Sequence, residues 1–190
     1  MASVPQVSTY AIDRYHFVSQ WLHWITALLV LAILPIAWVM VVLPHESPWV
    51  GTLVMFHKSI GVTIFALILF RIFWRALNPA PPLPWTLEPW EAIAAKLSHV
   101  LLYVVFLVMP VSGYILSAAS NHPVNYFNLF TLPPLPENKP LAKIADAVHV
   151  WTQWAVYALV AIHILGTAYH IIVKRDGVLD RMLPKQVNAD

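Results

Sequence analysis

The chain has 190 residues, of which 59% are hydrophobic and 11% charged, and its mean hydropathy is +0.68. This composition excludes an average soluble domain. It contains no cysteine, which excludes disulfides, thiolate-bound metals and cysteine-ligated iron–sulfur clusters. The net charge of +2 comes without a basic run, so nucleic acid is not an expected partner.

Four apolar stretches are long enough to cross the hydrocarbon core of a lipid bilayer, which needs roughly 20 helical residues. They cover about residues 17–43, 52–74, 94–118 and 147–173. We therefore expect an all-α membrane protein, with one four-transmembrane-helix bundle over residues 1–190. The first stretch exceeds the apolar region of a signal peptide and lacks a small-residue cleavage site, so it should be retained.

Lysine and arginine predict the orientation of these spans. Eight of the eleven precede span one, bracket the connection between spans two and three, or follow span four. These eight are Arg14, Arg71, Arg75, Lys96, Lys174, Arg175, Arg181 and Lys185, and the other three are Lys58, Lys139 and Lys143. The positive-inside rule therefore predicts that both termini are cytoplasmic.

The first two spans each carry one histidine near their start. Span one enters from the cytoplasm, so His23, about six residues in, should lie in the inner half of the membrane. Span two begins outside, so His57, about five residues in, should lie in the outer half. A proline-rich connection over residues 78–90 then leads to span three. The external segment after span three, about residues 119–146, is a candidate lid over the outer surface.

Span four carries histidines at two depths. His149 and His163 are 14 residues apart, which gives roughly 21 Å of rise and a net rotation of only about 40°. The helix therefore presents one imidazole at each of two levels on nearly the same face. Imidazoles are costly in hydrocarbon and usually have a function there.

Antiparallel topology sorts the four histidines into an inner pair, His23 with His163, and an outer pair, His57 with His149. Structural zinc normally takes four protein ligands and catalytic zinc three. Two opposed imidazoles suit a haem iron instead, because the porphyrin supplies the remaining four nitrogens. Gly61 would leave room for a flat macrocycle, and Gly166 three residues after the inner ligand would do likewise. The alternative is four core histidines hydrogen-bonded to neighbouring helices.

At these residues the chain resembles the bacterial cytochrome b561 family. The matching motifs are LHW (22–24), HKSIG (57–61), LSHVLLYVVFLVMPVSGY (97–114) and VH (148–149) with a second histidine fourteen residues later. The resemblance implies a four-helix protein of the bacterial inner membrane that carries electrons between the membrane faces. It also implies two b haems bound by His23, His57, His149 and His163.

The layout is most similar to that of superoxide oxidases in this family. The resemblance implies that electrons pass from superoxide, or another periplasmic one-electron donor, to ubiquinone near the inner haem. His170 matches a histidine of the quinone site, seven residues beyond the inner ligand. His16 and His99 are expected near the same inner mouth, where the three rings could protonate a reduced quinone. The alternative for each is an interfacial histidine that contacts water and headgroups.

Three cations are candidates for contacts with haem propionates or anions. Arg71 and Arg75 lie one turn apart at the inner end of span two, and Lys58 follows the outer ligand. Lys58 could also attract superoxide toward the outer haem. Snorkelling to the interface and a role in topology are the alternatives for the two arginines.

Three functions are compatible with these features. The first is an oxidoreductase that acts alone between an external donor and membrane quinone, and it is the preferred interpretation. The second is a membrane-anchor cytochrome b subunit that passes electrons between a soluble dehydrogenase or hydrogenase and the quinone pool. The third is a structural or transport protein without haem.

Overall fold

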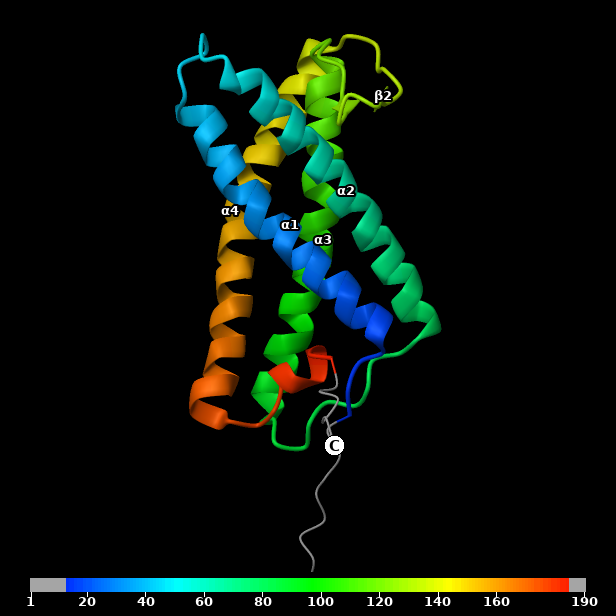
Figure 1. Cartoon of the computed structure of the whole chain (residues 1–190), viewed down its shortest axis with the longest axis vertical. Helices are drawn as coiled ribbons and strands as arrows, with labels where there is room; N and C mark the ends of the chain where they lie inside the picture. Colours follow the sequence, from blue (N-terminus) through cyan, green and yellow to red (C-terminus); the bar gives the residue numbers. More distant parts are fainter. Residues whose placement is uncertain (1–12, 185–190) are drawn as a thin grey trace, which may run out of the picture.

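The computed structural model describes residues 13–184, so the ends of the expected 1–190 unit, including Lys185, lie outside the described residues. Four long helices dominate it (Figure 1). They are α1 Phe17–Val42, α2 Trp49–Leu77, α3 Pro89–Ala119 and α4 Lys139–Tyr169. All four are long and apolar enough to cross a membrane. The expectation of an all-α, four-helix membrane bundle is confirmed.

Three of the four long helices begin before the apolar stretches that predicted them. The third begins at Pro89, five residues before the expected start of its span, and the fourth begins at Lys139 in place of residue 147. Glu91 accepts a hydrogen bond from the backbone N–H of Glu88, and Asn138 caps the next helix by accepting from the N–H of Leu141. Hydropathy marks the hydrocarbon core, whereas caps and prolines in the first turn decide where a helix starts.

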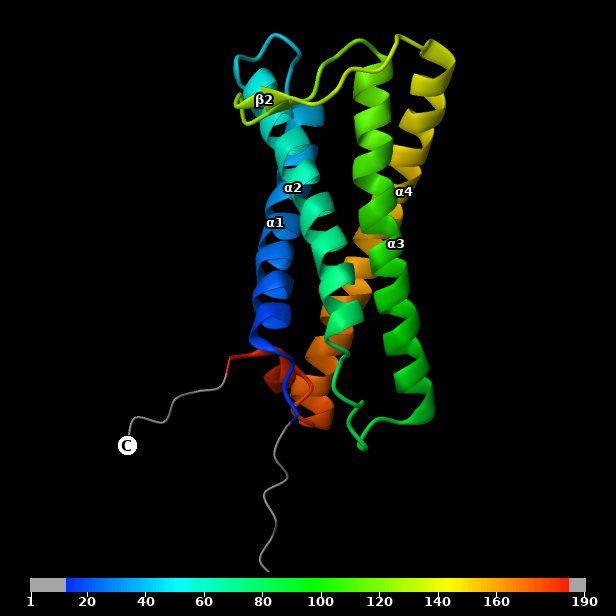
Figure 2. The ribbon, with the colours of Figure 1, turned by 90° about the vertical axis from the view of Figure 1, so that its right-hand side faces the viewer.

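The bundle consists of two helix pairs. Figure 2 shows α1 beside α2 and α3 beside α4, and α2 joins the pairs by packing on α3. Within the described residues, α4 makes little backbone contact with α1 or α2. A buried cluster of Val30, Ile60, Ile64 and Ile68 fills the space between α1, α2 and α3.

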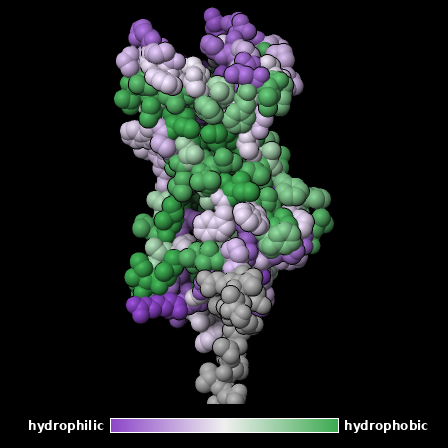
Figure 3. Space-filling view, in the orientation of Figure 1, coloured by the Kyte–Doolittle hydropathy of each residue, from purple (hydrophilic) through white to green (hydrophobic). Residues whose placement is uncertain are grey.

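Large apolar side chains also cover the outside of the bundle. Leu28 is 69% exposed and Leu165 is 68% exposed. In Figure 3 hydrophobic residues cover much of the length, and the most hydrophilic residues gather mainly near the two ends. A soluble monomer rarely exposes so large an apolar surface, whereas a lipid bilayer would cover it.

A short hairpin lies over one end of the bundle, which we call the hairpin end. Its strands are β1 Asn125–Tyr126 and β2 Phe130–Thr131, paired antiparallel. The fully buried Ser59 of α2 accepts a hydrogen bond from the N–H of Phe127 at 2.8 Å and donates to the carbonyl of Asn125 at 3.3 Å. The segment expected as a lid is therefore attached to α2 two residues beyond His57.

The opposite end, which we call the terminal end, carries the start of α1 and the end of α4. After α4 come a π-helix, η1 His170–Lys174, and a short 3-10 helix, η2 Leu179–Met182. The Arg181 guanidinium is buried and donates to the carbonyls of Asp13, Pro81 and Pro82. This contact joins η2 to the segment before α1 and to the α2–α3 connection.

Candidate functional site

Two histidine rings face each other near the hairpin end. His57 of α2 and His149 of α4 have ring centroids 6.2 Å apart and ring planes at 77°. The Nδ1 of His149 lies 3.0 Å from the carbonyl oxygen of Met109 and 3.2 Å from the hydroxyl of Ser112. Because a carbonyl only accepts, Nδ1 must carry the proton, and Nε2 is left with its lone pair. This is the tautomer that an Nε2 metal ligand requires.

A second pair faces across the bundle nearer the terminal end. His23 of α1 and His163 of α4 have centroids 6.1 Å apart and planes at 64°. His99 of α3 lies closer still to His163, with centroids 5.3 Å apart. The Nδ1 of His99 contacts the carbonyl oxygen of Ala95 at 2.6 Å, one turn earlier on its own helix. Three rings from three helices therefore meet at this level.

The ring separations fit an iron held between two imidazoles. Two metal–nitrogen bonds of about 2 Å, with roughly 1 Å from each nitrogen to its ring centre, place the centroids about 6 Å apart. The pairs His57–His149 and His23–His163 match this spacing. The 5.3 Å between His99 and His163 is too short for a metal centred between those rings.

The protein supplies few ligands beyond these imidazoles. Among residues 13–184, no cluster of three or more His, Cys, Asp or Glu side chains could hold a metal ion. A metal at either pair would therefore need most of its ligands from another group, and the tetrapyrrole of haem supplies four. Facing side chains of helix bundles commonly form such sites. The residues present fit haem at both levels.

Glycines lie next to both pairs. A Cβ added at Gly166 would meet nothing within 4 Å, and one at Gly61 would meet only Ile33 Cδ1 at 4.0 Å. Neither position has a close neighbour, and Gly166 is exposed. A Cβ at Gly113 would instead lie 2.8 Å from Cε1 of His149. Gly113 therefore allows the His149 ring to pack directly on the backbone of α3.

The other three candidate histidines have different partners. His16 accepts a hydrogen bond from the N–H of Val18 at the start of α1 and lies against the ring of Trp74. His99 belongs to the group around His163, as described above. His170 contacts Asp176 through Nδ1 at 2.7 Å. No ring-to-ring contact joins these three histidines within the described part of the chain, so they do not form one packed cluster.

The candidate cations lie at opposite ends of the bundle. Lys58 donates a hydrogen bond from Nζ to the carbonyl of Pro123 at 3.3 Å, which ties it to the segment before the hairpin. The Arg71 guanidinium lies over the ring of Tyr103, with 5.8 Å to the centroid. Arg71 and Arg75 both line a small pocket at the terminal end. Among residues 13–184, the Arg71 side chain forms no ion pair.

Several residues that complete these sites are not evident from the sequence. Ser112 and Gly113 hold the His149 ring, and both lie within the motif that ends span three. Asp176 follows the last span, and only the turn after α4 brings it back to His170. Their place in that motif was the available signal for the first two residues. No local pattern indicates the contact made by Asp176.

Together, the fold and the facing imidazoles define a class of protein: a four-helix membrane bundle with histidine pairs suited to haem. Comparison with known proteins agrees with that class. The family model described as prokaryotic cytochrome b561 matches residues 14–185. The chain belongs to this family. It is therefore a multi-pass bacterial membrane protein that binds b-type haem and transfers electrons.

Relatives match over most of their length. Cytochrome b561 homolog 2 of Escherichia coli strain K12 is 32% identical over 175 residues, which cover 91% of this chain and 93% of the relative. A protein of Yersinia pestis named probable superoxide oxidase CybB is 28% identical, over 91% of this chain and 97% of its own. Cytochrome b561 homolog 1 of Escherichia coli strain K12 is 24% identical, and the match covers 92% of this chain and 99% of the relative.

Proposed function

We propose that this chain is a di-haem cytochrome, a single domain with one haem b held by His57 and His149 and a second by His23 and His163. Haem iron supplies one-electron transfer at each pair. The observation that carries the proposal is the pair of ring separations, 6.2 and 6.1 Å, at two levels of the bundle. Arg71 and Arg75, which lie close together at the terminal end, are the proposed partners of the haem propionates.

The proposed reaction moves electrons from an external one-electron donor, with superoxide preferred, to ubiquinone. Two superoxide anions give two molecules of dioxygen and two electrons, and ubiquinone takes up two electrons and two protons to form ubiquinol. The match to a relative named probable superoxide oxidase supports superoxide as the donor. Lys58 supports it too, because a cation beside His57 would attract an anion.

The orientation follows from the positive charges. Most lysines and arginines lie toward the terminal end, which we assign to the cytoplasmic face of the inner membrane. The hairpin end then faces the periplasm and the donor. His170, near the terminal end, is assigned to the quinone, with His16 and His99 as further candidates near the same end. His170 lies about 10 Å along the helix axis from His163.

Haem stoichiometry tests the two sites. Purified protein should contain two b haems by pyridine-haemochrome assay. His57→Ala and His149→Ala should each remove the same haem, and His23→Ala and His163→Ala should each remove the other. His45→Ala, at an exposed loop histidine of the hairpin end, is the matched control and should retain both. The assignment would be contradicted if the protein contained one haem. It would also be contradicted if substitutions from different pairs, such as His23→Ala and His57→Ala, removed the same haem.

Rapid mixing tests the reaction. Superoxide should reduce the haems, and a soluble ubiquinone should reoxidise them. Lys58→Met should slow the reduction and weaken its dependence on salt, because the charge that attracts the anion is gone. Lys143→Met, also on an exposed residue toward the hairpin end, is the control. If superoxide fails to reduce the haems and a soluble dehydrogenase or hydrogenase co-purifies, the anchor-subunit function replaces this one.

A further inference from the structure

The end of α4 has an unusual geometry at the candidate quinone histidine. A π-helix begins at His170, and the N–H of Arg175 donates to the carbonyl of His170 at 2.7 Å. The backbone then turns back through a left-handed Arg175, with φ of 51°, and a left-handed Gly177, with φ of 73°. Such π segments are rare and frequently occur at functional sites. The turn brings Asp176 back toward the helix that it follows.

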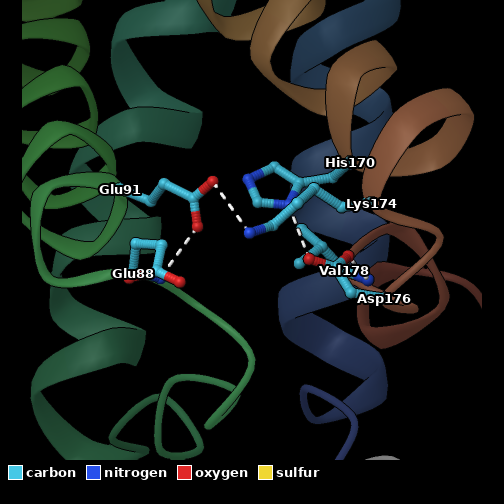
Figure 4. A network of polar contacts seen from close by, with 6 residues as sticks. All are labelled: Glu88, Glu91, His170, Lys174, Asp176 and Val178. Carbon is cyan, nitrogen blue, oxygen red and sulfur yellow. Dashed lines mark hydrogen bonds and ion pairs between the residues drawn. The ribbon is translucent and has the colours of Figure 1, made fainter.

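Asp176 contacts the His170 ring directly (Figure 4). Its Oδ2 lies 2.7 Å from Nδ1 of His170, and its Oδ1 accepts a hydrogen bond from the N–H of Val178 at 3.3 Å. The Asp176 side chain is only 4% exposed, whereas that of His170 is 15% exposed. An ionised carboxylate accepts but does not donate, so it fixes the ring proton on Nδ1. Nε2, which has no partner among residues 13–184, is left for a ligand.

A second ion pair holds the same turn in place. Lys174 Nζ lies 3.3 Å from Oε1 of Glu91, whose side chain is 3% exposed. The other oxygen of Glu91 accepts from the N–H of Glu88, at the start of α3. Figure 4 shows the Glu91 carboxylate approaching Lys174 and the Asp176 carboxylate approaching His170. The π-helix is therefore anchored to α3, and the orientation of the imidazole depends on Asp176.

We propose that Asp176 is the positioning residue for His170 in proton transfer to the quinone. The inference rests on the assignment of His170 to the quinone site in the proposed function. With Nδ1 protonated and bonded to Asp176, Nε2 takes a proton from water on the terminal side. The ring then passes that proton from Nε2 to a quinone carbonyl oxygen as the quinone receives its electrons. His170 supplies one of the two protons of ubiquinol and is reprotonated from water.

Asp176→Asn changes this arrangement with little change in volume. The amide group can donate to Nδ1, and then the ring proton moves to Nε2, which is the wrong tautomer for accepting a proton from water. We expect reoxidation of dithionite-reduced protein by a soluble ubiquinone to slow by about tenfold or more. Both haem spectra should stay unchanged, because no iron ligand is touched. The control is Asp180→Asn, an acidic residue of η2 whose side chain has no hydrogen-bond partner among residues 13–184.

A double-mutant cycle separates positioning from general support of the fold. If Asp176 acts only through His170, Asp176→Asn combined with His170→Ala should reoxidise no more slowly than His170→Ala alone. Multiplied losses in the double variant would overturn the proposal. Nitrogen-15 NMR of histidine-labelled protein gives a second measurement, since the His170 signals should report the Nδ1–H tautomer in the wild type and lose it in Asp176→Asn. An unchanged tautomer would also overturn it.

The outcomes distinguish this inference from the function on which it rests. If His170→Ala leaves reoxidation by quinone unchanged, the quinone assignment of His170 fails and this inference fails with it. If His170→Ala slows reoxidation but Asp176→Asn does not, only the role of Asp176 fails. If Asp176→Asn prevents folding, the variant Asp176→Glu tests the role of Asp176 in its place. That variant should keep the carboxylate, the Nδ1–H tautomer and most of the reoxidation rate, and loss of the rate with the tautomer retained would refute the proposal.

Discussion

Gly113→Ala should disturb one histidine pair and spare the other. The added Cβ would lie 2.8 Å from Cε1 and 3.1 Å from Nδ1 of His149. Ordinary carbon contacts lie near 3.5–4.0 Å, so the ring must move by at least about 0.7 Å or the helices must separate. The ring cannot move freely, because Nδ1 is bonded to the carbonyl of Met109 and to Ser112. Overpacking of this kind costs about 1–3 kcal/mol.

Part of that cost is offset, since alanine favours a helix over glycine by about 1 kcal/mol. The remaining strain falls on the His149 ring. Each 1.4 kcal/mol of binding free energy lost to this strain corresponds to about a tenfold loss of affinity for the group that His149 binds. We therefore expect Gly113→Ala to lose or weaken the haem near the hairpin end and to keep the other. Haem quantification and redox titration measure this directly.

Gly51→Ala is the matched control for that experiment. It also replaces a helical glycine, but its Cβ would meet nothing within 4 Å. It should keep both haems and their midpoint potentials. The steric reasoning is refuted if Gly113→Ala keeps two haems with wild-type potentials, or if Gly51→Ala loses as much haem as Gly113→Ala does.

Two further predictions concern the ends of the bundle. Ser59→Ala removes the side chain that bonds the backbone of the hairpin, so the free energy of unfolding should fall by about 1–3 kcal/mol. Hydrogen–deuterium exchange should rise over residues 123–131, and unchanged protection there would contradict the role of Ser59. Arg181→Ala leaves three backbone carbonyls without their donor and should lower the free energy of unfolding by about 2–3 kcal/mol, measured by unfolding in detergent. Arg181→Lys should recover only part of this loss, because an ammonium lacks the planar fork that reaches several carbonyls, and full recovery would show that charge alone suffices.

The sequence alone determined the class of fold and the levels of the four paired histidines. Apolar stretches of spanning length must become helices in a membrane, because hydrocarbon offers no partners for free backbone groups. The fixed rise and rotation of a helix then place His149 and His163 at two depths on one face. Alternating helix direction assigns His57 to one depth and His23 to the other, and in the structure those rings lie opposite each other.

The tertiary structure decided the contacts around those rings. His99 lies beside His163 because α3 packs closely on α4, and no spacing along the chain specifies that rotation. The need for glycine at residue 113 follows from the same packing. Asp176 meets His170 because a π-helix and two left-handed residues reverse the chain after α4. Helical periodicity is a local property of the backbone, whereas the packing of one helix on another and the path of an irregular turn depend on contacts distant in sequence.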